Sequence, residues 1–119
     1  MAEFNKYKVS KELEEMAIEV LEIARHSGKI KKGINEVTKS IERGQAQLVY
    51  IADNVEPPQI VMHLPPLCKE KNVPFLVVGS KENLGKYAGI QVAASSVAII
   101  DPGDGKKLLK DLIEKLSSK

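Results

Sequence analysis

Asn35, Glu36 and Lys39 are three polar residues whose spacing can bring their side chains together. Asn35 lies four residues before Lys39 and Glu36 three before it, so they become surface neighbours if the segment is helical. A carboxylate can accept two parallel hydrogen bonds from N1–H and N2–H₂ of a guanine, and an amide or ammonium can donate to O6. Because Watson–Crick pairing occupies the N1 edge and A-form RNA hides its major groove, this chemistry suits guanines in bulges or in non-Watson–Crick pairs.

A purely local interpretation of the same trio also stands. Glu36 in a first helical turn interacts favourably with the helix dipole, and Lys39 can pair with it. Taken alone, the trio favours this interpretation. The binding interpretation gains from the basic run Lys29–Lys32 and from Gly33, which marks a tight turn into the helix. A helix N-terminus exposes backbone N–H groups and favours anions.

A second candidate site begins at Glu56, which Pro57, Pro58 and Ile60 follow. Together these residues could form a small pocket, part acidic and part apolar, that takes a flipped base. The alternative is a helix start with proline in its first turn and one core isoleucine. By itself, this segment favours the alternative.

Ile90, Gln91 and Val92 follow Gly89 and precede a β-prone run that starts at Val97. An apolar loop here, at the edge of a sheet, could cover unstacked bases. The same residues could instead be the start of the strand at Val97. The sequence leaves both interpretations open.

Residues 79–86 resemble a phosphate-binding loop, since they follow an apolar strand and precede a helical pattern. That loop requires four residues between its glycines and a Ser or Thr after its lysine, whereas this segment has five and then a tyrosine. A small nucleotide-binding enzyme that uses this loop is the alternative function, and the malformed motif disfavours it. Lys81 and Lys86 remain suitable contacts for phosphate.

The totals favour one domain, because 119 residues that are 43% hydrophobic suffice for a single core. The net charge is only +2, so a nucleic-acid partner requires a local basic face. Residues 29–44 supply one, with five Lys or Arg against two acids. With no Trp, two Phe and three Tyr, the chain is poorly suited to an aromatic stacking platform.

Other chemistries find little support. His26, His63 and Cys68 lack metal-ligand spacing, and no pair of carboxylates suggests acid–base catalysis, so we expect no metal, no cofactor and no enzymatic activity. The single cysteine fits a reducing cytosol. We see neither a signal peptide nor a run of about 18 apolar residues, and therefore expect a cytoplasmic protein without a membrane span.

Helical and β-prone segments alternate along the chain. Helices are expected between Ser10 and Gly28 and at about 33–43, 81–88 and 104–116, with two shorter helical pieces over 57–71 that Pro65 and Pro66 separate. Extended segments are expected at 29–32, 48–52, 74–78 and 97–100. Residues 1–8 are expected to be loosely packed. This order predicts an α/β sandwich with a largely parallel sheet.

Five segments combine into a specific pattern. They are Lys-Gly-Ile-Asn-Glu-Val-Thr-Lys at 32–39, Ile-Ala-Asp-Asn-Val-Glu-Pro at 51–57, His-Leu-Pro-Pro-Leu-Cys at 63–68, Gly-Ser-Lys-Glu-Asn-Leu-Gly at 79–85, and the loop at 90–95. From about residue 10 to 116 the chain resembles the kink-turn RNA-binding family, and most closely its archaeal large-subunit ribosomal members of the "L-seven-Ae" type. The resemblance implies a three-layer α-β-α sandwich with a small, mixed, largely parallel sheet of about four strands.

The resemblance also implies a function. Archaeal members bind kink-turns and kink-loops in ribosomal RNA, nucleate box C/D and box H/ACA guide ribonucleoproteins, and can join ribonuclease P, which has a role in tRNA processing. The implied partners are therefore kink-turn RNA, the large ribosomal subunit and the guide-RNP core proteins, with a monomeric protein in the absence of RNA. Which of these assemblies the chain joins is left open.

Residue roles carry over by position within this resemblance. Asn35, Glu36 and Lys39 would read tandem sheared G·A pairs. Glu56 and Ile60 would line the pocket for a protruding nucleotide, with Lys81 nearby, and the loop at 90–92 would cover the loop nucleotides. Many archaeal relatives carry an acidic residue where Gln91 stands, so the range of RNA targets stays open. The expected RNA contacts are Lys32, Gly33, Asn35, Glu36, Lys39, Arg43, Glu56, Ile60, Lys81, Lys86, Ile90, Gln91 and Val92.

Overall fold

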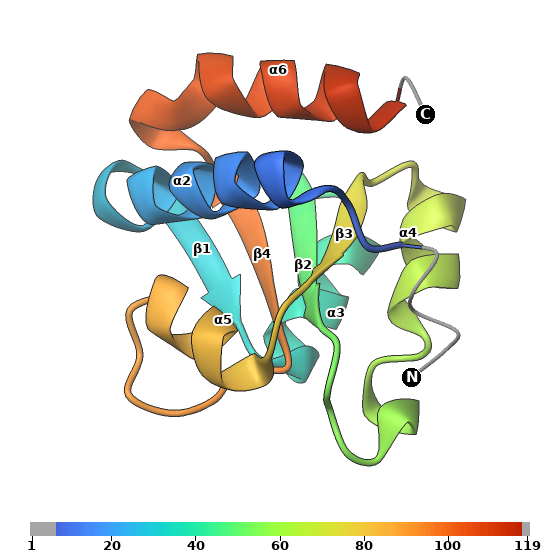
Figure 1. The fold of residues 1–119 in the computed structure, drawn as a ribbon. Helices are drawn as coiled ribbons and strands as arrows, with labels where there is room; N and C mark the ends of the chain where they lie inside the picture. Colours follow the sequence, from blue (N-terminus) through green and yellow to red (C-terminus); the bar gives the residue numbers. More distant parts are fainter. Residues whose placement is uncertain (1–6, 118–119) are drawn as a thin grey trace.

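The computed structural model describes residues 7–117, in which helices cover both faces of a four-stranded sheet (Figure 1). The helices are α2 (Lys11–Ser27), α3 (Ile34–Glu42), α4 (Leu64–Lys71), α5 (Lys81–Tyr87) and α6 (Lys106–Ser117), with short 3-10 turns η1 (Pro58–Ile60) and η2 (Gly103–Gly105). The strands are β1 (Lys29–Lys32), β2 (Leu48–Ala52), β3 (Phe75–Val78) and β4 (Ser96–Asp101).

The helices form two layers around the sheet. α2 and α5 pack on one face, with α6 beside α2, whereas α3 and α4 lie on the other face (Figure 1). β2 lies between β4 and β3, and all five of its residues are buried. Burial on both faces explains why this strand reads as an unbroken apolar run. The predicted α/β class and the three-layer arrangement are confirmed.

The strand order is β1-β4-β2-β3, and only one of the three pairings, β2 with β3, is parallel. β4 is antiparallel to both β1 and β2. The expectation of a largely parallel sheet is therefore wrong. The reason lies in the connection from β3 to β4: α5 is short, and the N–H of Ala94 donates to the carbonyl oxygen of Lys81 at 2.9 Å. The chain thus begins β4 at the end of the sheet where β3 stopped, and β4 must run back.

The start of α2 follows from its sequence. Ser10 is the N-cap, and its side chain accepts a 3.3 Å hydrogen bond from the backbone N–H of Leu13. Glu12 and Glu14 lie in the first turn, near the positive end of the helix dipole. One face is buried at helical spacing and consists of Leu13, Ala17, Val20, Leu21 and Ala24.

Tyr7 is half-buried and Lys8 is exposed, yet both contact the rest of the protein, which differs from the expectation of a loose segment 1–8. Residues 1–6 of that segment lie outside the described part. The carbonyl oxygen of Tyr7 accepts a 3.2 Å hydrogen bond from the N–H of Val77, at the outer edge of β3. The ring of Tyr7 lies 5.0 Å from that of Phe75. The Nζ atom of Lys8 lies 3.0 Å from a carboxylate oxygen of Asp53.

The segment 57–71 also departs from expectation. Pro57 and Pro58 begin only a single 3-10 turn, η1, and the residues after it form turns up to His63. α4 then starts at Leu64, three residues before the expected second helical piece. Pro65 and Pro66 lie in its first turn, where backbone N–H groups have no partner within the helix, so the missing N–H of proline costs no hydrogen bond. The two prolines therefore start a helix here.

Candidate nucleic-acid interface

The segments that carry the predicted contacts meet at one end of the sheet, where β1, β2 and β3 end and β4 begins. The N–H of Gly33, just before α3, donates to the carbonyl oxygen of Ser96 at 3.0 Å. The N–H of Asp53, just after β2, donates to the carbonyl oxygen of Gly79 at 3.1 Å. The start of α3, the segment after β2, the start of α5 and the loop before β4 therefore form one edge, at the bottom of Figure 1.

Asn35, Glu36 and Lys39 are all exposed on α3, on the side away from the buried Val37 and Ile41. Their common face follows from helical periodicity, so the predicted juxtaposition of the three side chains holds in the fold. Gly33 precedes the helix with φ +93°, a conformation that favours glycine. Having no side chain, it leaves the approach to the first turn of α3 uncovered.

The carboxylate of Glu36 makes an ion pair with Lys31 of β1, at 3.6 Å. The local interpretation of the trio had instead paired Glu36 with Lys39. Both partners are about half exposed, with side-chain exposures of 48% for Lys31 and 55% for Glu36. An exposed pair of this kind contributes little to stability. Glu36 is therefore held loosely enough to exchange Lys31 for another donor.

Glu56 and Ile60 lie in the segment that leads from β2 to α4, and both are exposed, Ile60 to 39%. Asn54 ties this segment to α5: its side-chain oxygen accepts a 2.8 Å hydrogen bond from the N–H of Lys81. Glu56 and Ile60 thus belong to the same edge as Lys81. The pocket for a protruding base stays a prediction.

Ile90, Gln91 and Val92 form a loop, because β4 begins only at Ser96. Of the two open interpretations, the loop is confirmed and the early strand start is wrong. Val92 is 70% exposed and Gln91 is also exposed, whereas Ile90 is half-buried. An apolar side chain as exposed as that of Val92 is available to a partner.

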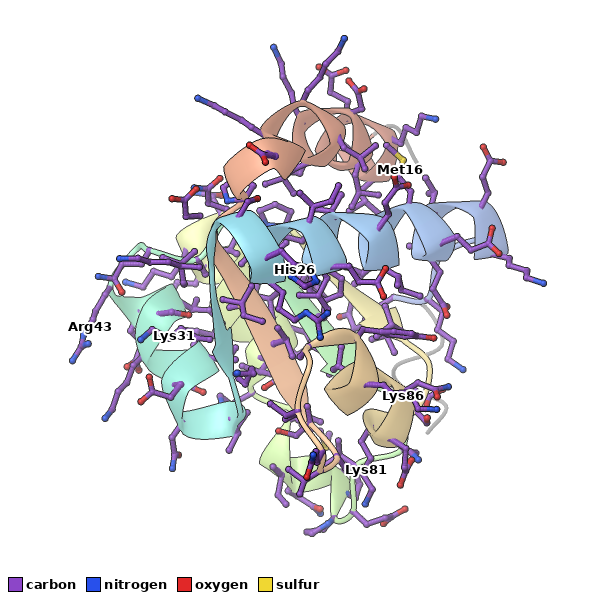
Figure 2. All side chains as sticks on the ribbon, turned by 90° about the vertical axis from the view of Figure 1, so that its left-hand side faces the viewer. Met16, His26, Lys31, Arg43, Lys81 and Lys86 are labelled. Atoms are coloured by element: carbon purple, nitrogen blue, oxygen red, sulfur yellow. The ribbon has the colours of Figure 1, made fainter. Side chains whose placement is uncertain are left out.

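The predicted cations lie on both sides of this edge. Arg43 lies on one side of the sheet, together with Lys31, which is not among the predicted contacts, and Lys81 and Lys86 lie on the other side (Figure 2). Arg43 follows α3 at the end away from Gly33, so it lies apart from the start of the helix, although it lines the same depression as Glu36. A depression of about 400 Å³ lies between α3 and β1, and both Arg43 and Lys31 line it. Its lining residues are Lys29, Lys31, Glu36, Lys39, Ser40, Arg43, Gln45 and Ile100.

Sequence reasoning missed three residues at this edge. Asn54 is a short amide in the turn that follows β2, a position typical of a side chain that bonds to backbone. Thr38 and His63 lie 2.9 Å apart, Oγ1 to Nε2, and connect α3 to the start of α4. His63 is exposed. No pattern in the sequence indicates its contact with Thr38, because 25 residues separate them.

The alternative chemistries gain nothing from the fold. Residues 81–87 form a helix, α5, which leaves no loop to wrap a phosphate group. Cys68 is buried, and burial raises the pKa of its thiol to about 12. Within residues 7–117, no three His, Cys, Asp or Glu side chains are placed to hold a metal ion. In the same range, no helix has the length and apolar character of a membrane span.

Comparison with known proteins agrees with this architecture. Residues 16–109 match the family described as ribosomal protein L7Ae/L30e/S12e/Gadd45. The solved structure described as the 15.5kD RNA binding protein of Giardia lamblia superposes with a TM-score of 0.87 at 30% sequence identity. The match covers 93% of this chain and 92% of the Giardia chain. The motifs, the fold and both matches lead to one assignment: the chain belongs to the ribosomal protein L7Ae/L30e/S12e/Gadd45 family.

Proposed function

We propose that the chain is an RNA-binding, non-catalytic protein that grips kink-turn or kink-loop RNA and stabilises its bend. The observation that carries this proposal is the convergence of two surfaces at one end of the sheet. One is the polar face of α3, with Glu36 at its centre, and the other is the exposed apolar loop at Val92. Polar side chains that can hydrogen-bond to base edges, next to an apolar loop that can contact base faces, suit RNA whose bases are unpaired or unstacked.

Each part of the edge has a proposed role. Asn35, Glu36 and Lys39 read the free edges of guanines in tandem sheared G·A pairs. Gly33 lets the RNA approach the start of α3. Glu56 and Ile60 line the site of a protruding nucleotide, and the loop of Ile90, Gln91 and Val92 covers the loop nucleotides. The proposed phosphate contacts are Lys32, Arg43, Lys81 and Lys86.

The cellular setting we propose is that of a ribonucleoprotein protein. The family description names ribosomal proteins, and the Giardia neighbour is described as RNA-binding. We therefore propose kink-turns of ribosomal RNA and of box C/D and H/ACA guide RNA as targets, with ribonuclease P RNA as a further one. The protein would be a cytoplasmic monomer before it binds RNA, and would then meet the large ribosomal subunit or guide-RNP core proteins.

A gel-shift comparison tests this function. Wild-type protein, Glu36→Ala and Glu114→Ala are titrated against a kink-turn RNA and a plain duplex of equal length. Wild type should prefer the kink-turn, and Glu36→Ala should lose about 1–3 kcal/mol of that binding free energy. Glu114→Ala removes an equal charge from α6 and should bind as wild type does. Equal binding of wild type to both RNAs would refute kink-turn recognition.

A further inference from the structure

Arg25 lies near the end of α2, outside the proposed RNA contacts, yet its side chain reaches the loop that carries three of them. A Cβ atom added to Gly89 would lie 2.6 Å from Cδ and 3.0 Å from Cζ of Arg25, and would overlap Nη1. The side chain therefore rests on Gly89, the residue directly before Ile90. The end of α2, marked by His26 in Figure 2, lies above α5 in that view.

Gly89 is suited to this contact in two ways. Its φ is +80°, in the left-handed region that favours glycine. Its N–H donates to the carbonyl oxygen of Lys86 at 3.0 Å, and the N–H of Ile90 donates to that of Gly85 at 3.0 Å. These two bonds are a Schellman motif that ends α5. Any side chain at 89 would strain this turn and displace Arg25.

The loop is held at further points on α5. A Cβ atom on Gly85 would overlap the carbonyl oxygen of Val92, so the loop backbone folds directly onto the helix. The N–H of Ala94 closes the loop by its bond to Lys81. α5, the helix directly before the loop, thus contacts the loop backbone, whereas Arg25 contacts Gly89 from a different helix, α2.

A neighbouring side chain orients Arg25. Its Nη2 atom lies 2.8 Å from Nε2 of His26. A guanidinium can only donate, so the imidazole nitrogen of His26 accepts this hydrogen bond. An otherwise exposed arginine, with many accessible rotamers, is thereby restrained beside the loop.

We propose that Arg25 is a positioning residue that fixes the loop of Ile90, Gln91 and Val92 in its RNA-binding conformation before RNA arrives. A loop that is already ordered loses less conformational entropy on binding, so it binds more tightly. This inference rests on the proposed function only for the consequence in RNA binding. The positioning itself is a property of the RNA-free protein.

Hydrogen exchange of the RNA-free protein tests the positioning. The variants are Arg25→Ala, which removes the whole side chain, and Arg25→Met, which keeps an unbranched stem over Gly89 without the charge. Arg25→Ala should speed exchange of the Ile90 and Ala94 amides by about tenfold or more. Arg25→Met keeps the stem over Gly89 but loses the bond to His26, so its exchange should fall between those of Arg25→Ala and wild type. The Val37 amide, which donates to the carbonyl oxygen of Gly33 at the start of α3, is the internal control. Unchanged Ile90 and Ala94 exchange in Arg25→Ala would overturn the proposal.

Kink-turn RNA binding supplies the second readout. Arg25→Ala should bind about three- to tenfold more weakly with an unchanged salt slope, because no phosphate contact is lost. Lys107→Ala, which removes an equal charge from exposed α6, should bind as wild type does. A slope lower by about one unit, with loop exchange unchanged, would make Arg25 a phosphate contact and overturn the proposal. Wild-type protein that fails to bind kink-turn RNA would instead reject the proposed function, whatever the exchange result.

Discussion

The side-chain oxygen of Asn54 accepts a 2.8 Å hydrogen bond from the backbone N–H of Lys81, which starts α5. Its amide nitrogen donates at 3.2 Å to Oε1 of Glu82. Asn54 therefore uses both ends of its amide to hold the segment that leads to Glu56 against α5. Ser80 caps the same helix by accepting from the N–H of Asn83 at 3.1 Å. The position of Lys81 at the edge is thus fixed from two directions.

Asn54→Ala should lower the free energy of unfolding by about 1 kcal/mol, since the N–H of Lys81 loses its partner at an exposed site. It should also weaken kink-turn binding, because Glu56 and Lys81 are no longer held together. In a Glu82→Gln background, Asn54→Asp keeps the oxygen acceptor without setting two carboxylates against each other, and it should be more stable than Asn54→Ala in the same background. Urea unfolding and gel shifts measure both effects, with Asn83→Ala as control. An Asp variant no more stable than the Ala variant would contradict this account.

Glu82 reports on the same contact through its titration. The hydrogen bond from Asn54 is the largest cause that lowers the pKa of the Glu82 carboxyl from its ordinary value of 4.5. Because the folded-state pKa is depressed, the associated stability is present above pH 4.5 and is lost as the pH falls through the folded pKa. In Asn54→Ala, an NMR titration should find the pKa of Glu82 closer to 4.5. An unchanged titration would assign the shift to the backbone hydrogen bond instead.

The sequence predicts most of this fold because its local signals agree. Gly28, Gly44 and Gly89 stop helices, and buried strands read as apolar runs. The direction of β4 could not be predicted, because it depends on where the short α5 returns the chain. The packing of Tyr7 could not be predicted either, since its partners Phe75 and Val77 are distant in sequence.

The candidate site also has a part that the sequence predicts and a part that depends on packing. Helical periodicity alone places Asn35, Glu36 and Lys39 on one exposed face, so this part was predictable. The partner of Glu36 was not, because Lys31 belongs to β1 and faces α3 only after the strand has paired with β4. Asn54 was missed for a similar reason, since its bonds join the turn after β2 to the start of α5. Contacts between elements are set by packing, and local spacing carries no information about them.

The pair of Lys31 and Glu36 should contribute little to folding, which keeps Glu36 available to RNA. A double-mutant cycle with Lys31→Ala and Glu36→Ala should find a coupling of at most about 0.5 kcal/mol in urea unfolding, because both side chains are about half exposed. The cycle with Thr38 and His63, also a contact between elements, gives a comparison on the same helix. Coupling above about 1 kcal/mol would mean that the ion pair holds Glu36 in the protein and that RNA must break it.

Lys32 and Arg43 should act as separate phosphate contacts, because they lie at opposite ends of the β1–α3 side of the molecule. Lys32→Ala and Arg43→Ala should each reduce the slope of log affinity against log salt by about one unit. Arg43→Ala should matter only for RNAs whose stem is long enough to follow the depression along α3. Affinities measured over a salt series, for one kink-turn RNA with a long stem and one with a short stem, distinguish the contact of Lys32 from that of Arg43. Loss of binding to the short RNA in Arg43→Ala would contradict this placement.

Tyr50 joins the sheet to α2, since its hydroxyl donates a 2.5 Å hydrogen bond to the carbonyl oxygen of Ala17. Tyr50→Phe should lower the free energy of unfolding by about 1 kcal/mol at pH 7, because a buried bond is lost without a change of shape. Burial raises the pKa of the Tyr50 hydroxyl well above its ordinary value of 10.0. The raised pKa stabilises the fold fully below pH 10.0, and that contribution falls as the pH rises towards the folded-state pKa. Urea unfolding at a series of pH values should therefore find that the gap between wild type and Tyr50→Phe narrows above pH 10.0. A gap that stays constant there would show that Tyr50 ionises as easily in the folded chain as in the unfolded one.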